Sequence, residues 1–205
     1  MVKPKFKRTK HLPMSPGATS DDKIHSSIDH ILGQYGTITE KRDGENLSMN
    51  NIELWARSID STGGNLRSRA LQLHSQIKYD IPDGMIICGE NLQYEHSLGY
   101  KNLKSVFEVF AIFYEGRKLK LVETLEWCTL LGLTHVPVMY HGIITEKVIW
   151  DTIKSIDTSV QEGFVVSADG FNSEDYTEMT AKYVRAGHVT TDEHWKKNPK
   201  ENTFI

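Results

Sequence analysis

Three short β-like runs in the first third of the sequence constrain the fold most strongly. They cover residues 35–41, 45–50 and 52–58. The joints between them are Asp43-Gly44 and Asn50-Asn51, and both favour tight turns because Asn, Asp and Gly tolerate positive φ. The sequence therefore predicts an antiparallel meander with Lys41 at one of its corners.

The rest of the chain alternates between helical and extended patterns. Apolar residues spaced three or four apart predict helices over residues 24–33, 66–77, 121–131 and 148–156, the last capped by Thr145. Further strands are predicted at residues 85–88, 106–114, 117–121, 136–140, 162–167 and 181–185. Antiparallel strands interleaved with separate helices indicate an α+β domain.

The strand at residues 106–114 is rich in aromatic side chains. Strict alternation predicts that Phe107, Val109, Ala111 and Phe113 share one face, and that Phe110 and Ile112 share the other.

The chain length predicts one domain with extensions at both ends. At 205 residues it suffices for one well-buried core, whereas a second full domain would be crowded. Residues 1–22 are rich in Pro, Ser and Lys and predict a basic arm, although Ser20-Asp21-Asp22 resembles a helix start. We assign residues 23–190 to the folded domain and residues 191–205 to a C-terminal tail.

Charge and hydropathy limit the classes of partner. The net charge of -3 argues against a protein that coats nucleic acid indiscriminately, although basic residues gather in the arm and at Lys196, Lys197 and Lys200. Charge alone leaves two interpretations open for these segments, solvated tails or contacts with nucleic acid. There is no apolar run of membrane-spanning length and no secretory signal, so we expect a cytoplasmic location.

Cysteine and histidine positions give no indication of a zinc site. Cys88 and Cys128 lie far apart in apolar surroundings, so we expect reduced, buried thiols. The nine histidines never form a metal-spaced pair with acidic or thiol neighbours on one element. His135 and His141 bracket an apolar strand and are interpreted as polar residues at its ends.

Lys41 is the candidate nucleophile. A free lysine has a pKa of about 10.4, so only about one in a thousand is neutral near pH 7.4. Nucleophilic attack requires a lower pKa, achieved by burial or by neighbouring cations. The prediction is therefore that cations surround Lys41 and that carboxylates lie close enough to hold a metal ion. The candidate cations are Arg57, Lys182 and Arg185, and the candidate carboxylates are Glu90 and Glu162.

The order of these motifs is more specific than any one of them. Lys-x-Asp-Gly at 41–44 is followed by an Arg-Ser strand, a Gly-Glu strand end, the aromatic strand, Glu-Gly-Phe-Val at 162–165 and a late basic strand. This series resembles the covalent nucleotidyltransferases, which comprise ATP-dependent DNA ligases, RNA ligases and mRNA capping enzymes. The resemblance extends over about residues 35–185.

The resemblance implies a covalent mechanism. Lys41 would attack the α-phosphorus of ATP, release pyrophosphate and hold AMP as a phosphoramidate. Lys182 would hold the α-phosphate in the transition state, and Glu162 would serve a metal ion. Mg²⁺ (or Mn²⁺) fits this role, because Mg²⁺ prefers one or two carboxylates together with substrate phosphates.

The resemblance also implies how the nucleotide is bound. Glu40 would contact the adenine edge, Glu90 the ribose hydroxyls, and Asn46 and Arg57 the phosphates and the nucleic-acid end. Phe110 would stack on adenine; plain core packing is the alternative for this ring.

Two positions depart from the family pattern. Ala111 stands where these families usually place an acid after the stacking ring, and Lys182 is followed by Tyr183-Val184-Arg185 rather than by Lys-x-Lys. Arg185 is the candidate second cation, but alternation points it to the opposite face from a residue at 184.

Within the superfamily, the pattern is most similar to the RNA ligases that seal breaks in duplexed RNA. Glu40 and Asn46 match that type, and the roughly twenty residues after Arg185 are too few for the C-terminal OB domain of DNA ligases and capping enzymes. We expect an ATP-dependent RNA ligase that transfers AMP to a 5′-phosphate and seals it to a 3′-hydroxyl. A partner chain would supply any missing domain. The alternatives are a minimal ATP-dependent DNA ligase and an inactive nucleotide- or RNA-binding module.

Overall fold

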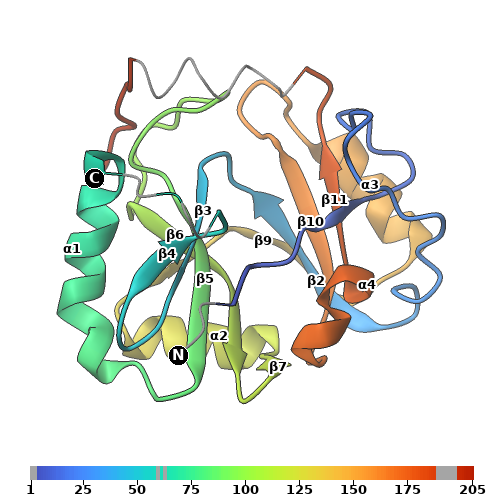
Figure 1. Ribbon diagram of the computed structural model, residues 1–205. Helices are drawn as coiled ribbons and strands as arrows, with labels where there is room; N and C mark the ends of the chain where they lie inside the picture. Colours follow the sequence, from blue (N-terminus) through green and yellow to red (C-terminus); the bar gives the residue numbers. More distant parts are fainter. Residues whose placement is uncertain (1–3, 59–60, 62–63, 188–197) are drawn as a thin grey trace.

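Two sheets form the framework of the protein in the computed structural model, which describes residues 4–58, 61, 64–187 and 198–205 (Figure 1). The first sheet has the order β1 (Lys10–His11), β11 (Thr180–Val184), β10 (Gly163–Ala168), β2 (Tyr35–Lys41), β9 (Val138–Ile143). The second has the order β4 (Leu54–Ala56), β3 (Glu45–Met49), β5 (Met85–Asn91), β6 (Phe107–Tyr114), β7 (Arg117–Lys118), with β8 (Thr134–His135) also beside β6. Neighbouring strands are antiparallel, except that β1 with β11 and β6 with β8 are parallel.

Helices cover the outer face of each sheet. The α-helices are α1 (Ser68–Ile77), α2 (Leu121–Leu130), α3 (Glu146–Ser155) and the short α4 (Tyr176–Met179), with 3₁₀ turns at Gly64–Arg67, Lys78–Asp80 and Ser173–Asp175. Residues of α1 and α2 pack with the second sheet in one apolar core, and α3 packs with the first sheet in another. The α+β class is therefore confirmed, as is the Thr145 cap, whose hydroxyl accepts a hydrogen bond from the Val148 backbone N–H at 3.2 Å.

Alternation along the first sheet separates its apolar face from its cleft face. Ile38, Val166 and Ala181 point into the core beneath α3. Their chain neighbours on the opposite face line a cleft between the two sheets. These cleft-facing residues are Thr37, Thr39, Lys41, Val165, Ser167, Thr180 and Lys182.

The predicted meander is wrong at its first joint. β3 and β4 do pair, but β2 and β3 lie in different sheets, so residues 42–44 carry the chain from one sheet to the other. A Cβ atom at Gly44 would lie 2.4 Å from the Asn91 carbonyl oxygen, so glycine serves a close approach here rather than a hairpin turn. Lys41 consequently ends one sheet where the second begins.

A β-bulge overturns the predicted faces of the aromatic strand. The register of β5 with β6 pairs Cys88 with Ala111 but Gly89 with Val109, which leaves Phe110 as the extra residue. Ile112 therefore shares the core with Phe107 and Val109, whereas Phe110 and Ala111 both line the cleft.

Several predicted elements differ from those observed. Residues 24–33 form turns rather than a helix, because a stretch this short depends on tertiary packing, and Ile28 and Ile31 reach the core from a loop. Ser20-Asp21-Asp22 likewise starts no helix. The strand predicted at 117–121 is shorter, since β7 ends at Lys118 and Leu121 already begins α2. The strand predicted at 136–140 begins later, at Val138, and continues to Ile143.

Both ends of the described chain pack onto the domain. β1 lies within the predicted arm and pairs with β11, and Leu12 is fully buried in the first core. At the other end, Asn202 hydrogen-bonds Leu92 and Tyr100, and Phe204 packs beside Leu103. The boundaries at residues 22/23 and 190/191 stay predictions, and residues 191–197, including Lys196 and Lys197, lie outside the described residues. No described helix combines the length and apolarity needed to cross a bilayer.

Candidate active site

A cleft of about 940 Å³ opens between the two sheets and gathers the predicted site residues. The first sheet contributes Glu40, Lys41, Glu162 and Lys182, and the second contributes Asn46, Glu90 and Phe110. Arg57, just after β4, lines the cleft as well. Among the described residues predicted for the site, only Arg185 is not part of the lining.

Lys41 and Glu162 form the central contact. Lys41 ends β2 directly opposite Gly163, so Glu162, the preceding residue, lies beside the lysine amine. The Lys41 Nζ donates a hydrogen bond to Glu162 Oε2, whose side chain is only 5% exposed. A Cβ atom at Gly163 would lie 1.9 Å from the Tyr183 carbonyl oxygen, so this glycine allows β10 and β11 to close tightly behind the pair.

The pKa of Lys41 is shifted in the direction opposite to the prediction. Burial alone lowers the pKa of Lys41, but the Glu162 and Glu90 carboxylates, with Asp43, outweigh it and hold the pKa above its ordinary value. Burial raises the pKa of Glu162, and it raises the pKa of Glu90 to about 8 against the opposing effect of Lys41. The predicted carboxylates therefore lie close to Lys41, but the net effect on its pKa is upward, whereas nucleophilic attack requires a lowered pKa.

Lys182 is the second cation close to this pair. It lies on β11 opposite Val165, and its amine is 3.6 Å from an oxygen of Asp22. Burial lowers the pKa of Lys182, and the nearby positive charge of Lys41 acts in the same direction, against the attraction of Asp22. Asp22 had no predicted role at the site. Sequence alone does not indicate one, because its contact depends on the loop from residues 12 to 34.

Glu40 is buried, and both of its carboxylate oxygens accept hydrogen bonds. Arg42 donates to its Oε1 at 2.6 Å, and Gln161 donates to its Oε2 at 3.1 Å. Arg42 also donates to the buried Glu108 at 2.7 Å. Arg42 therefore bridges two buried carboxylates. An adenine ring that binds Glu40, as predicted, would have to share or displace the hydrogen bonds from Arg42 and Gln161.

Asp43 fixes the loop that borders the cleft after β5. Its Oδ2 accepts hydrogen bonds from the Ser97 backbone N–H at 2.7 Å, the Ser97 hydroxyl at 2.6 Å and the Leu98 N–H at 2.9 Å. Arg185 reaches the same loop, since its guanidinium donates to the Ser97 hydroxyl at 3.3 Å. Asp43 of Lys-x-Asp-Gly therefore anchors this loop, and Arg185 contacts the same loop through Ser97.

The remaining predicted residues occupy the second sheet. Asn46 lies opposite Glu90 in the β3–β5 register, and its side-chain oxygen is buried without a hydrogen-bond partner among the described residues. Arg57 is exposed at the mouth of the cleft. Phe110 packs edge-on against Phe6 at 5.4 Å between ring centroids, so its ring has both a protein contact and a face on the cleft.

Sequence reasoning missed Lys118. This lysine on β7 is 6% exposed, lines the cleft and lies 5.5 Å from the centre of the Phe171 ring. Burial lowers its pKa to about 8, against the attraction of Asp169. The sequence signal was weak: a lysine between Arg117 and Leu119 in a predicted hairpin is typical of a solvated strand.

The cleft around Lys41 contains carboxylates of the chemical type that hard divalent cations bind. Glu90 and Glu162 line it, and Mg²⁺ and Mn²⁺ prefer carboxylate oxygens as ligands. Burial raises the pKa values of Glu90 and Glu162 even though the positive charge of Lys41 acts in the opposite direction.

Comparison with known proteins identifies the family. A sequence profile described as RNA ligase matches residues 35–184. Similar solved structures include an archaeal ATP-dependent RNA ligase (TM-score 0.61, 16% identity, 89% of this chain and 48% of that one). A putative ATP-dependent DNA ligase from Aquifex aeolicus has a TM-score of 0.54 and 19% identity, over 78% of this chain and 46% of that one. A Naegleria gruberi RNA ligase variant with ATP and Mn has a TM-score of 0.55 and 14% identity, over 95% of this chain and 63% of that one.

At these low sequence identities, the similarity to the solved structures is a similarity of fold. The chain spans about half the length of the first solved structures that it matches. No curated protein sequence matches it. The profile covers well over half of the sequence, from the first strand of the cleft to the last, and this chain therefore belongs to the RNA ligase family.

Proposed function

We propose that this protein is an ATP-dependent RNA ligase that adenylates itself on Lys41, transfers the AMP to a 5′-phosphate and seals that end to a 3′-hydroxyl. One observation carries the proposal: a lysine amine lies in a large cleft between two sheets, bonded to Glu162 and within the electrostatic influence of Glu90 and Lys182. Membership of the RNA ligase family supports the same conclusion.

In the first step the Lys41 Nζ forms a bond to the α-phosphorus of ATP, and the bond to pyrophosphate breaks. The amine has to lose a proton for this attack, and Glu162, which already accepts its hydrogen bond, is placed to receive it. Lys182 faces the same space and would neutralise charge that develops on the α-phosphate. Mg²⁺ or Mn²⁺, when bound by the cleft carboxylates, supplies positive charge that offsets both them and the phosphates.

Nucleotide recognition would use both sheets. Glu40 is proposed for the adenine edge and Phe110 for the adenine face, and Glu90 for the ribose hydroxyls. Asn46 and the exposed Arg57 lie toward the second sheet and would meet the phosphates and the nucleic-acid end. For Arg185, the contact with Ser97 supports an indirect role through the 96–98 loop.

The test is covalent labelling. We expect incubation with α-labelled ATP and Mg²⁺ to give a label that survives denaturing electrophoresis. The label should be lost in Lys41→Ala and in Lys41→Arg, because a guanidinium is always protonated and is no nucleophile. Lys104→Ala, which removes an exposed lysine outside the cleft, is the matched control and should label normally.

Two results would contradict the proposal. A label that persists in Lys41→Arg would place the nucleophile elsewhere, and reversible ATP binding with no label in wild type would favour an inactive binding module, for which Ala111 gives some support.

The second competitor is a minimal DNA ligase, which the fold shared with the Aquifex aeolicus protein favours. Nicked duplexes with RNA or DNA on each side of the nick separate the two, since the proposal requires faster sealing of RNA strands. Two further expectations stay predictions. One is a partner chain that supplies a further domain, and the other is a cytoplasmic location.

A further inference from the structure

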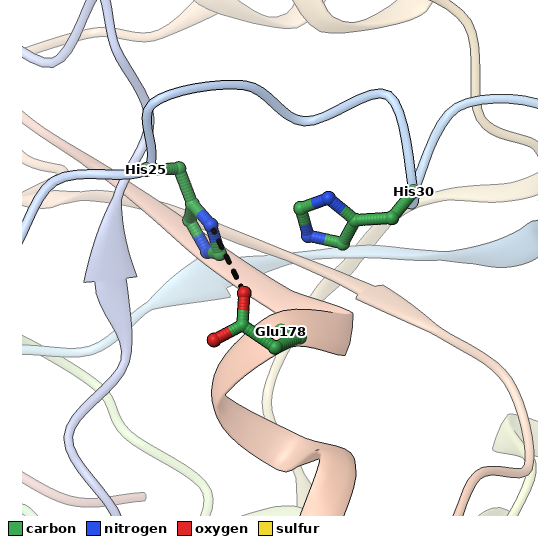
Figure 2. Close-up of side chains that lie close together, drawn as sticks. All are labelled: His25, His30 and Glu178. Carbon is green, nitrogen blue, oxygen red and sulfur yellow. Dashed lines mark ion pairs between the residues drawn. The ribbon is translucent and has the colours of Figure 1, made fainter.

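Two histidines and a glutamate converge beside β11, outside the lining of the cleft (Figure 2). His25 and His30 lie on the loop between β1 and β2, and Glu178 lies on α4. One possible ligand atom from each residue lies within 4.8 Å of the other two. None of the three lines the cleft, and the proposed ligase reaction uses none of them.

His25 is oriented as a metal ligand usually is. Its side chain is almost fully buried, and its Nε2 is 2.9 Å from the Thr180 carbonyl oxygen, so Nε2 is the protonated nitrogen. The other nitrogen, Nδ1, then carries a lone pair and faces Glu178 Oε2 at 4.0 Å (Figure 2). A backbone carbonyl that holds the second ring nitrogen is the usual outer-shell partner of a histidine bound to a metal ion.

His30 supplies an independent observation. Its Nε2 is buried and has no hydrogen-bond partner among the described residues. Its ring lies 5.3 Å from the ring of His25, so the two imidazoles approach without bonding each other. Buried polar nitrogens are almost always paired, and a cation between the rings would provide the missing partner.

Glu178 completes the set from the solvent side. Lys10 donates to its Oε1 at 2.5 Å, which leaves Oε2 toward the histidines. The positive charge of Lys10 opposes a cation, but it is bound to the oxygen that points away.

We propose that His25, His30 and Glu178 bind one transition-metal ion of the Zn²⁺ type, with water as the fourth ligand. Two imidazoles and one carboxylate are a common zinc ligand set, whereas Mg²⁺ prefers oxygen ligands alone. With zinc–ligand bonds of about 2.0–2.2 Å, ligand atoms in a tetrahedral site lie about 3.4 Å apart. Since the present ligand atoms lie within 4.8 Å of one another, they have to approach by at most about 1.4 Å. The half-buried His30 and the exposed Glu178 have room for that movement.

The ion would join segments that are distant in sequence. It would tie the loop before β2 to the helix that leads into β11, the strand of Lys182. The sequence pattern predicted no zinc site because a loop sets the spacing of the two histidines and the carboxylate comes from the other end of the chain.

The test uses the full chain, stripped with a chelator and titrated with Zn²⁺ and with Co²⁺, whose visible spectrum reports coordination. We expect one equivalent to bind, and at about 100 times its Kd we expect Zn²⁺ to raise the Tm by roughly 5–10 °C. His30→Ala and Glu178→Gln should each weaken binding at least about tenfold and remove the Tm shift. His25 is left in place because its burial would confound a loss of binding with a loss of fold.

Two controls distinguish this site from others on the chain. His141→Ala removes a half-buried histidine bound to Asp169, and Glu162→Gln removes a carboxylate of the cleft. Both variants should still bind one equivalent of Zn²⁺. Binding that is as tight in His30→Ala as in wild type, a loss in Glu162→Gln instead, or no saturation at one equivalent would each overturn the proposal.

Discussion

Lys118 gives a test of how burial and charge are balanced around the cleft. The residue is 6% exposed, and burial lowers the pKa of its amine from the ordinary 10.5 to about 8. Replacing it with methionine, which has a similar length and no charge, removes the cost of holding that charge away from water. We therefore expect Lys118→Met to unfold at a higher temperature than wild type near neutral pH.

The magnitude follows from the pKa difference. A drop of about 2.5 units corresponds to roughly 3 kcal/mol of folding free energy when the lysine is charged in both states. The variant also loses the attraction of Asp169 and the cation–π contact with Phe171, so we expect a net gain of about 1–2 kcal/mol at pH 7. For a chain of this size that is a rise in Tm of roughly 2–8 °C.

The sign of the pH dependence is specific. Below pH 8 the lysine is protonated in the folded and the unfolded chain, and the full cost is present. Between about pH 8 and 10.5 the folded protein has lost this proton while the unfolded chain keeps it, so wild-type stability rises relative to the variant. The advantage of Lys118→Met should therefore shrink by roughly 2 kcal/mol between pH 7 and pH 9.5.

The assay is urea or thermal unfolding of wild type and variant at both pH values. Lys104→Met, which removes an exposed lysine, is the matched control and should change stability by less than about 0.5 kcal/mol at either pH. Two results would show that burial of the Lys118 ammonium does not destabilise the folded protein. One is a Lys118→Met variant that is less stable than wild type at pH 7, and the other is a stability advantage of the variant that is the same at pH 9.5.

Two further predictions concern the framework of the cleft. Arg42→Ala removes the donor shared by Glu40 and Glu108, so two buried carboxylates lose their counter-charge. We expect urea unfolding to show a loss of about 3 kcal/mol of stability. The exposed Arg117–Glu123 pair is the control, and Arg117→Ala should cost less than about 1 kcal/mol. Gly163→Ala places a Cβ atom against the Tyr183 carbonyl, so β10 and β11 have to separate; adenylation in the labelling assay should fall at least about tenfold, and unchanged labelling would show that the Lys41–Glu162 geometry tolerates this shift.

Local sequence patterns predicted the elements that depend on their own residues. The strand at residues 35–41, the helices over 121–131 and 148–156 and the Thr145 cap follow from periodicity and capping chemistry, which act within a few residues. The motif order also predicted which side chains would meet, since the predicted site residues other than Arg185 line one cleft.

Features that depend on distant segments were not predictable in the same way. A turn signal such as Asp43-Gly44 does not reveal whether the next strand pairs with the previous one or starts another sheet. The bulge at Phe110 depends on the register with β5, and one extra residue exchanges the faces of all that follows. The acids around Lys41 and the cluster of His25, His30 and Glu178 likewise arise only when separate strands and loops come together.

The carboxylates around Lys41 affect the reactivity of its amine before a substrate binds. With Glu162 bonded to it and Glu90 nearby, the amine is held charged, and a charged amine does not attack phosphorus. In the proposed reaction the same carboxylates would also bind a hard cation, whose charge would offset the negative charge that they place beside Lys41. Occupation by a cation would withdraw negative charge from Lys41 and lower its pKa. If Lys41 is the nucleophile as proposed, the acids that make it unreactive in the free protein would therefore confine its activation to the cleft loaded with a cation and ATP.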